Sequence, residues 1–257
     1  MLWIIQDSKG MHYNWIAMYQ AVKQIGSNAI FCAIGEEPAL LEQVNIIIGG
    51  DDFLDEMKQH NTEQHKMMIF DYDWLKVSSY KKLWNDAYLN CATHEICYSR
   101  LFELPKGRYF IRPTNDTKCF DGAVYSLPDD IEKLAACRNC HKTKSFCISI
   151  GPPYSVYAEW RFVIINHEIV SGSLYCKNGE SYVSDSVPKQ VADFVAHIID
   201  QTGENGPYVL DVADTNVGLK VLEANVFNAS NFYDCSRPAI VLAVEEYIKQ
   251  FVPSCVP

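Results

Sequence analysis

The stretch YVLDVADTNVGLKVLEAN, residues 208–225, contains two apolar, strand-like segments separated by a polar turn. Because side chains alternate across a strand, Glu223 and Asn225 point to the same face of the second segment. If the turn is centred on Val217, antiparallel pairing places Asp211 opposite Glu223 with both side chains on one face. The stretch therefore predicts a hairpin that brings two carboxylates and an amide oxygen together.

The acids of this hairpin have two explanations. Adjacent carboxylates repel each other unless they are protonated or bridged by a cation, and an all-oxygen cluster suits Mg²⁺, which completes its shell with water and substrate phosphates. A magnesium site formed by Asp211, Glu223 and Asn225 satisfies this chemistry. The alternative is a surface hairpin whose acids are solvated. The apolar residues that flank the acids favour the interior only slightly, so the sequence leaves both explanations open.

Basic residues elsewhere in the chain could meet an anion at such a site. In the apolar strand YAEWRFVII, Glu159 and Arg161 fall on one face, so the guanidinium pairs either with Glu159 or with a phosphate. In RYFIRPTNDTKCFDG, Arg112 ends a strand before a proline, and Lys118 lies in the loop that follows. For these last two residues, anion recognition and ordinary surface charge explain the sequence equally well.

Apolar periodicity divides the chain into three lobes. Residues 1–75 combine short apolar strands with a helical pattern at 14–26, which is typical of a small α/β lobe. Residues 76–150 begin with a helical, aromatic stretch and continue as strand, loop, strand, helix and strand, after which a Gly-Pro-Pro motif ends the lobe. Residues 151–257 contain two strands turned at Asn166-His167, a helix, the acidic hairpin and a closing helix.

Composition and charge limit the classes of partner. The chain has 257 residues, 48% of them hydrophobic, which is typical of a globular protein. A net charge of −10 opposes non-specific binding to nucleic acid, which needs dense Lys and Arg. No apolar run approaches the roughly 20 residues that cross a bilayer, and the start MLWIIQDSKG lacks the features of a secretory signal. We therefore expect a cytoplasmic protein without membrane or nucleic-acid partners, whose ten cysteines are mostly reduced.

The basic and acidic groups follow a definite order, in which the basic loop comes first, the Glu-Trp-Arg strand second and the acidic hairpin last. This order resembles the ATP-grasp superfamily, specifically a divergent peptide-ligase-like clade with an RP…D-x-K-x-F-x-G loop, which matches RPTNDTKCFDG. The resemblance covers residues 70–235, and its most specific part is the combination of Glu-Trp-Arg with Asp…Glu-Ala-Asn.

The resemblance implies an α+β fold of the ATP-grasp type, in which a nucleotide is held between two α+β lobes and an N-terminal α/β lobe precedes them. It implies ATP and Mg²⁺ as cofactors, with Asp211, Glu223 and Asn225 as the magnesium ligands. The implied activity is that of a ligase that forms C–N bonds. ATP phosphorylates a carboxylate, and an amine attacks the acyl phosphate, on a small-molecule or peptide substrate.

The resemblance also implies roles for individual residues. Lys118 is expected to contact the phosphates, and Arg161 to face the transferred phosphoryl group and the acyl-phosphate oxyanion, which makes these two the expected catalytic residues. The other implied nucleotide contacts are Arg112, Glu159 and, through backbone groups that bind adenine, Ile148, Ser149 and Ile150. Two features depart from the family: a glycine-rich loop over the phosphates is missing, and no Pro-Gly follows the Glu-x-Asn motif.

Other readings of the sequence compete with the ligase. Covalent nucleotidyltransferases use Lys-x-Asp-Gly to form a lysyl-AMP, but here two residues separate Lys118 from Asp121, which places the carboxylate on the other face of an extended segment. A non-catalytic nucleotide-binding member of the same superfamily is a further alternative. The motif CRNCH could bind zinc through Cys137, Cys140 and His141, although buried reduced thiols at a helix end explain it better.

The acceptor substrate is not identified by any motif. We expect the N-terminal lobe and residues 226–237 to shape its pocket, with Asn228, Ser230 and Tyr233 as weak candidates for contacts. Arg237 either binds a substrate carboxylate or serves packing alone. The oligomeric state is open.

Overall fold

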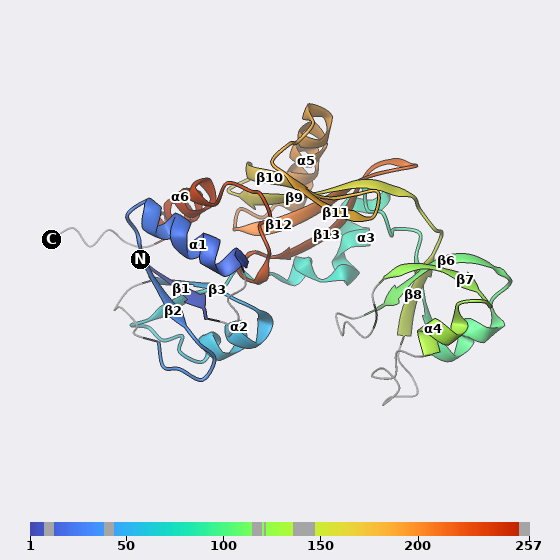
Figure 1. Ribbon diagram of the computed structural model, residues 1–257, viewed down its shortest axis with the longest axis horizontal. Helices are drawn as coiled ribbons and strands as arrows, with labels where there is room; N and C mark the ends of the chain where they lie inside the picture. The colour runs from blue at the N-terminus through green and yellow to red at the C-terminus, as the bar shows by residue number, and fades with distance from the viewer. Residues whose placement is uncertain (8–12, 39–43, 115–119, 121, 136–146, 252–257) are drawn as a thin grey trace.

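The computed structural model describes residues 1–7, 13–38, 44–114, 120, 122–135 and 147–251. These residues form three sheets, each in its own lobe (Figure 1). The N-terminal and small lobes lie at opposite ends of the molecule, and the large five-stranded sheet lies between them in Figure 1. Within the described ranges, no helix is long and apolar enough to cross a membrane.

The N-terminal lobe is a parallel sheet of order β2-β1-β3-β4 between two helices. Its strands are β1 (Leu2–Gln6), β2 (Asn28–Cys32), β3 (Val44–Ile48) and β4 (Lys66–Met68), and its helices are α1 (Tyr13–Gln24) and α2 (Asp51–Lys58). Alternate residues of β1 face opposite layers: Trp3 and Ile5 pack with α1, whereas Leu2 and Ile4 pack with α2. Burial of both faces explains why β1 is apolar throughout.

The small lobe is an antiparallel sheet of order β5-β8-β6-β7. Its elements are β5 (His94–Cys97), η3 (Tyr98–Glu103), β6 (Gly107–Pro113), β7 (Ala123–Leu127), α4 (Ile131–Ala135) and β8 (Cys147–Gly151). Its core is a separate cluster around Leu101, Ile111, Ile148 and Ile150.

The large lobe is an antiparallel sheet of order β11-β10-β9-β12-β13. Its elements are β9 (Val156–Ile165), β10 (Glu168–Lys177), β11 (Glu180–Ser184), α5 (Lys189–Thr202), β12 (Tyr208–Thr215), β13 (Gly218–Val226), η5 (Phe227–Ala229) and α6 (Arg237–Lys249). The β9–β10 turn falls at Asn166 and His167, as the sequence predicts, and both have positive φ, 57° and 61°. Helix α5 covers one face of the sheet, and α6 covers the other.

The lobes share more of their cores than the predicted boundaries at residues 75 and 150 indicate. The stretch η1 (Asp73–Leu75), α3 (Val77–Trp84) and η2 (Asn85–Ala87) packs on the large sheet, where Tyr80 and Trp84 join the core of α5. The expected start of the small lobe at residue 76 therefore differs from the packing. The N-terminal lobe likewise shares a core with the large lobe, because α1 packs beside α6.

The buried amide of Asn228 joins these two lobes through backbone hydrogen bonds. Its Nδ2 donates to the carbonyls of Ile47 (2.6 Å) and Met68 (2.9 Å), and its Oδ1 accepts from the Phe70 amide (2.7 Å). The side chain is completely shielded from solvent, and all its hydrogen-bonding groups are used. Asn228 therefore has a structural role, so the weak expectation that it contacts the acceptor is wrong.

Candidate functional site

A row of polar side chains crosses the face of the large sheet that α6 covers further along the strands. Strand pairing places Arg161 of β9 opposite Asp211 of β12, and Asp211 opposite Glu223 of β13. On this face Val163 and Val209, one step along the same strands, belong to the core under α6. The polar row thus begins where the apolar layer ends, and the predicted convergence of Asp211 and Glu223 is confirmed.

The hairpin reaches this register by a route that differs from the prediction. Its turn is closed by the pair Thr215–Gly218, so the centre lies half a residue before Val217. A bulge at Leu222 then restores the opposition of Asp211 and Glu223.

Arg161 and Asp211 form a buried, two-pronged ion pair. The Nε of Arg161 donates to Asp211 Oδ1 at 2.8 Å, and its Nη2 donates to Oδ2 at 2.6 Å. The side chains are only 12% and 2% exposed. Burial opposes the charge of Arg161, but the Asp211 carboxylate outweighs it and the pKa of the guanidinium is raised. Of the two anions predicted for Arg161, Glu159 is wrong, because the carboxylate that it meets belongs to a predicted metal ligand.

Glu223 and Asn225 complete the acidic group. Asn225 Nδ2 donates to Glu223 Oε1 at 3.1 Å and lies 3.5 Å from Asp211 Oδ2. Burial, together with the charge of Asp211, raises the pKa of the Glu223 carboxyl. A divalent cation would relieve this repulsion, and rotation of the Asn225 amide would add a third oxygen.

The donor set at this point suits a hard cation. Two carboxylates and an amide oxygen on adjacent strands are oxygen ligands of the kind that Mg²⁺ takes alongside water and phosphate. Groups of three or more His, Cys, Asp or Glu in a metal-binding arrangement are absent from the described ranges, so the site would rest on Asp211, Glu223 and the Asn225 amide. Asp211 would have to share its oxygens with Arg161.

Two stacked tyrosines, which the sequence analysis did not identify as a unit, enclose the guanidinium of Arg161. The rings of Tyr175 and Tyr233 lie 4.8 Å apart, and Arg161 Cζ lies 5.7 Å and 5.2 Å from their centroids. The hydroxyl of Tyr175 donates to Glu159 Oε2 at 2.6 Å, so Glu159 orients the ring. Alternation along β10 could have placed Tyr175 on this face, but only the fold shows that Tyr233 reaches it.

Arg112 supplies positive charge from the small lobe. In β6 it pairs with Ser149 of β8, and its charge opposes the rise in the pKa of Glu223 across the cleft. It also lowers the pKa of the Tyr88 hydroxyl, although burial has the larger, opposite effect. Gly122 closes against this region, because a Cβ there would lie 3.2 Å from the Cβ of Arg112. The loop residue Lys118 lies outside the described residues, and its role stays a prediction.

The residues predicted to bind adenine lie inside the small sheet. Ile148, Ser149 and Ile150 pair with β5 on one side and with β6 on the other. Their backbone groups therefore serve the two ladders. Their contact with adenine stays a prediction, and the pairing favours the segment directly after Gly151 as the place where backbone groups are available.

The remaining candidates are placed as follows. Ser230 is buried, and its hydroxyl donates to the Val226 carbonyl at 2.8 Å, which indicates a structural role. Cys137, Cys140 and His141 lie outside the described residues. Their proposed partners Cys91 and Cys97 are free thiols.

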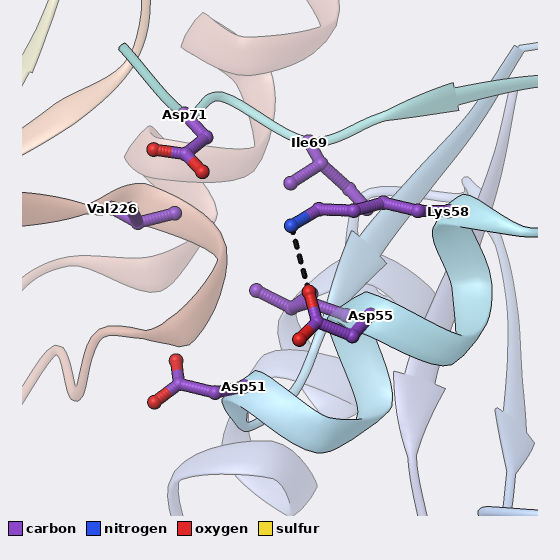
Figure 2. A pocket seen from close by; sticks show the side chains of 7 residues that line it. Asp51, Asp55, Lys58, Ile69, Asp71 and Val226 are labelled. Atoms are coloured by element: carbon purple, nitrogen blue, oxygen red, sulfur yellow. Dashed lines mark hydrogen bonds and ion pairs between the residues drawn. The ribbon is translucent and has the colours of Figure 1, made fainter. Parts of the chain in front are cut away.

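A pocket opens between the N-terminal lobe and the end of β13 (Figure 2). One face of α2 lines it with Asp51, Leu54, Asp55 and Lys58, and the opposite wall consists of Ile69, Asp71 and Val226. Lys58 Nζ donates to Asp55 Oδ1 at 2.9 Å, whereas the carboxylates of Asp51 and Asp71 point into the open space in Figure 2. The pocket begins one residue after Asn225 and has an acidic rim.

The fold and this site define an ATP-grasp protein: two α+β lobes face each other, with basic groups on one and a buried acidic group on the other. A family model described as an ATP-grasp domain, the third family of its clade, matches residues 53–244, and the chain belongs to this family. No curated protein sequence matches the chain.

Solved structures share the fold at low sequence identity. A RimK domain ATP-grasp protein from Sphaerobacter thermophilus has a TM-score of 0.59 and 12% identity, with 98% of this chain and 99% of that chain covered. D-alanine–D-alanine ligase from Bacillus anthracis complexed with ATP has a TM-score of 0.59 and 7% identity, over 97% and 96% of the chains. The ATP-grasp ligase PsnB with precursor peptide and AMPPNP has a TM-score of 0.54 and 12% identity, over 98% and 97%.

Proposed function

We propose that the protein is an ATP- and Mg²⁺-dependent ligase that joins a carboxylate to an amine through an acyl phosphate. The observation that carries this proposal is the row Arg161–Asp211–Glu223–Asn225, which faces Arg112 of the opposite lobe. Support comes from structures of the same fold whose titles name ligases: PsnB complexed with its minimal precursor, Mg and ADP, and D-alanine–D-alanine ligase complexed with ATP.

The side chains divide the electrostatic work between the lobes. Arg112 and Lys118 would contact the phosphates from the small lobe, and Glu159 would keep Tyr175 against Arg161 at the nucleotide. Asp211, Glu223 and Asn225 would hold Mg²⁺, which neutralises phosphate charge when bound. Arg161, fixed by Asp211 and by the Asn231 carbonyl at 3.0 Å from its Nη1, would offer its guanidinium to the transferred phosphoryl group and to the oxyanion.

The proposed reaction has two transfers. An oxygen of the substrate carboxylate attacks the γ-phosphorus, the bond from phosphorus to the bridging oxygen breaks, and ADP leaves. The amine nitrogen then attacks the acyl carbon, the C–O bond to phosphate breaks, and inorganic phosphate leaves while the amine loses a proton to solvent. Neither transfer needs a nucleophile from the protein, because positioned cations stabilise the charges that develop.

The acidic pocket supports an amine-bearing substrate. Its carboxylates at Asp51 and Asp71 favour a positively charged group, and its apolar wall of Leu54, Ile69 and Val226 suits a short side chain. We infer that an amino acid, a peptide or a similar small molecule enters here. The printed names of the similar structures include a peptide-precursor ligase and D-cycloserine synthetase, which act on substrates of these sizes.

A second candidate function is nucleotide binding without turnover. The observation that favours it is the occupancy of both Asp211 oxygens by Arg161, since an ion pair of this geometry competes with a metal ion for the same lone pairs. A lysyl-AMP nucleotidyltransferase is the weaker alternative, and it would require a covalent adduct on Lys118.

The test is release of ADP and phosphate from ATP in the presence of Mg²⁺ and pools of amino acids and dipeptides. A ligase releases both products only when a suitable pool is present, and mass spectrometry then shows a condensed product. Tight nucleotide binding with no product from any pool would favour the non-catalytic alternative. AMP release with an adduct on Lys118 would favour the nucleotidyltransferase.

A further inference from the structure

Arg237, the first residue of α6, carries a charge that lacks a carboxylate partner among the described residues. Its Nε is shielded from solvent and has no hydrogen-bond partner within the described part of the chain. Burial lowers the pKa of the guanidinium despite the opposing influence of Tyr13, Cys235 and Asp234. A desolvated guanidinium without a counter-charge is unfavourable unless an anion meets it, and its planar fork matches a carboxylate.

Arg237 is held in place by the start of α1. Its Nη2 donates to Asn14 Oδ1 at 3.3 Å, and its Cζ lies 5.9 Å from the ring centroid of Tyr13. Asn14 is itself fixed, because it is 1% exposed, its Oδ1 accepts from the Phe232 amide at 3.1 Å, and its Nδ2 donates to the Ser230 carbonyl at 3.2 Å. These contacts leave donors of the guanidinium fork free for an incoming group.

The surroundings of Arg237 favour an anion and are open to one. Tyr13 is 77% exposed, so the ring beside the guanidinium lies at the surface. Tyr13 also begins the 12-residue helix α1, whose first amides add positive potential. The arginine itself, rather than the helix end, supplies the charge and the fork.

The arginine lies next to the proposed site of phosphoryl transfer. The thiol of Cys235 lies 3.8 Å from the Arg161 carbonyl, and the charges of both Arg161 and Arg237 act on it. Cys235 therefore lies between the two arginines. The strand–helix topology adds a second link, because α1 and α2 both begin at the carboxyl ends of neighbouring strands β1 and β3. The arginine and the acidic pocket at Asp51 thus open at the same edge of the N-terminal sheet.

We propose that Arg237, with Asn14 and Tyr13, binds a free carboxylate of the substrate that is not the one phosphorylated, as in an amino acid or the last residue of a peptide. This inference rests on the proposed ligase and adds a substrate requirement: a free carboxylate in addition to the reacting groups. Arg237 acts by positioning, since it holds one end of the substrate while chemistry takes place beside Arg161. Amides and esters of the same compounds lack the charge that the fork recognises.

The test compares a pool of dipeptides with the pool of their C-terminal amides by saturation-transfer NMR, which reports binding without turnover. We expect the wild type to bind the free acids and not the amides. Arg237→Gln should weaken binding of the free acids about 100-fold, the loss expected for a charge-assisted, two-pronged hydrogen bond. Arg237→Lys, which keeps the charge and loses the fork, should give an intermediate loss. Arg108→Gln, which removes an exposed arginine of β6, is the matched control.

Two readouts keep this inference separate from the ligase proposal. ATP affinity should be the same in Arg237→Gln as in the wild type, and circular dichroism should show an unchanged fold. If free acids bind no better than amides, or bind equally well to Arg237→Gln and Arg237→Lys, the carboxylate subsite is wrong. If acids bind through Arg237 but ADP is not released, the subsite stands and the ligase proposal fails.

Discussion

Asp211→Asn and Glu223→Gln should have the same effect on metal-dependent chemistry and opposite effects on stability. Both substitutions preserve shape and remove a negative charge from the proposed Mg²⁺ site, so we expect each to abolish Mg²⁺-dependent nucleotide turnover. In Asp211→Asn, however, the guanidinium of Arg161 keeps its charge at a position where its side chain is only 12% exposed. In Glu223→Gln, a carboxylate that burial and Asp211 make unfavourable becomes neutral.

The structure sets the size of the two effects. Removing one partner of a buried ion pair costs about 3–5 kcal/mol, and we expect the lower end because asparagine still accepts one hydrogen bond from Arg161. For a chain of 257 residues, a loss of about 3 kcal/mol lowers the melting temperature by about 6–12 °C. Relief of carboxylate repulsion in Glu223→Gln should raise the free energy of unfolding by about 0.5–1 kcal/mol at neutral pH.

The gain in Glu223→Gln should depend on pH. The pKa of Glu223 is higher in the folded protein than in the unfolded chain, so ionisation of this group costs folding free energy. That cost is absent below the unfolded pKa, grows as pH rises between the two pKa values, and is constant above the folded one. The advantage of glutamine over glutamate should therefore disappear on acidification.

Calorimetric melting in a metal chelator measures these differences without interference from bound cations. Runs at about pH 4 and about pH 8 bracket the ordinary range of a glutamate. Glu168→Gln, which neutralises an exposed acid at the start of β10, is the control and should leave the melting temperature unchanged. An Asp211→Asn protein that melts with the wild type would show that the ion pair with Arg161 does not form, and the assignment of the site would have to be revised.

Further expectations concern both the cleft and the lobe contacts. Lys118→Ala should weaken ATP binding without any lysyl-adenylate ever appearing, and an AMP adduct on Lys118 in a mass spectrum would contradict this. Arg112→Gln should raise the KM for ATP about tenfold or more at unchanged stability, as loss of a charge-assisted phosphate contact implies, and steady-state kinetics with a thermal melt check both halves. Asn228→Ala should lower the free energy of unfolding by about 3 kcal/mol, since it removes three buried hydrogen bonds, and urea titration measures this.

Much of the site followed from strand alternation within one hairpin. The opposition of Asp211 and Glu223 is a local property, because a short turn and a two-residue period determine which side chains meet. The partner of Arg161 could not be obtained in this way. It depends on β9 lying beside β12, two strands that are distant in the chain, and local periodicity carries no information on that pairing.

The same limit explains the other differences. The sequence analysis missed α2, although Asp51 at its start and Phe53, Leu54 and Met57 on one face are ordinary helix signals, because the element is only eight residues long. The aromatic residues of α3 were correctly expected to be helical and were assigned to the wrong lobe, since an apolar face indicates burial without naming the surface that buries it.

The hydrogen bonds of Asn228 have a consequence for how the molecule can open. Because that amide is fully buried between β3, β4 and η5, and because α1 and α6 share one core, two of the three lobes are joined into a single body. Only the small lobe keeps a core of its own. Opening of the cleft should therefore occur at one joint, the connections of the small lobe, and the substrate-facing wall should stay rigid while the nucleotide enters and leaves.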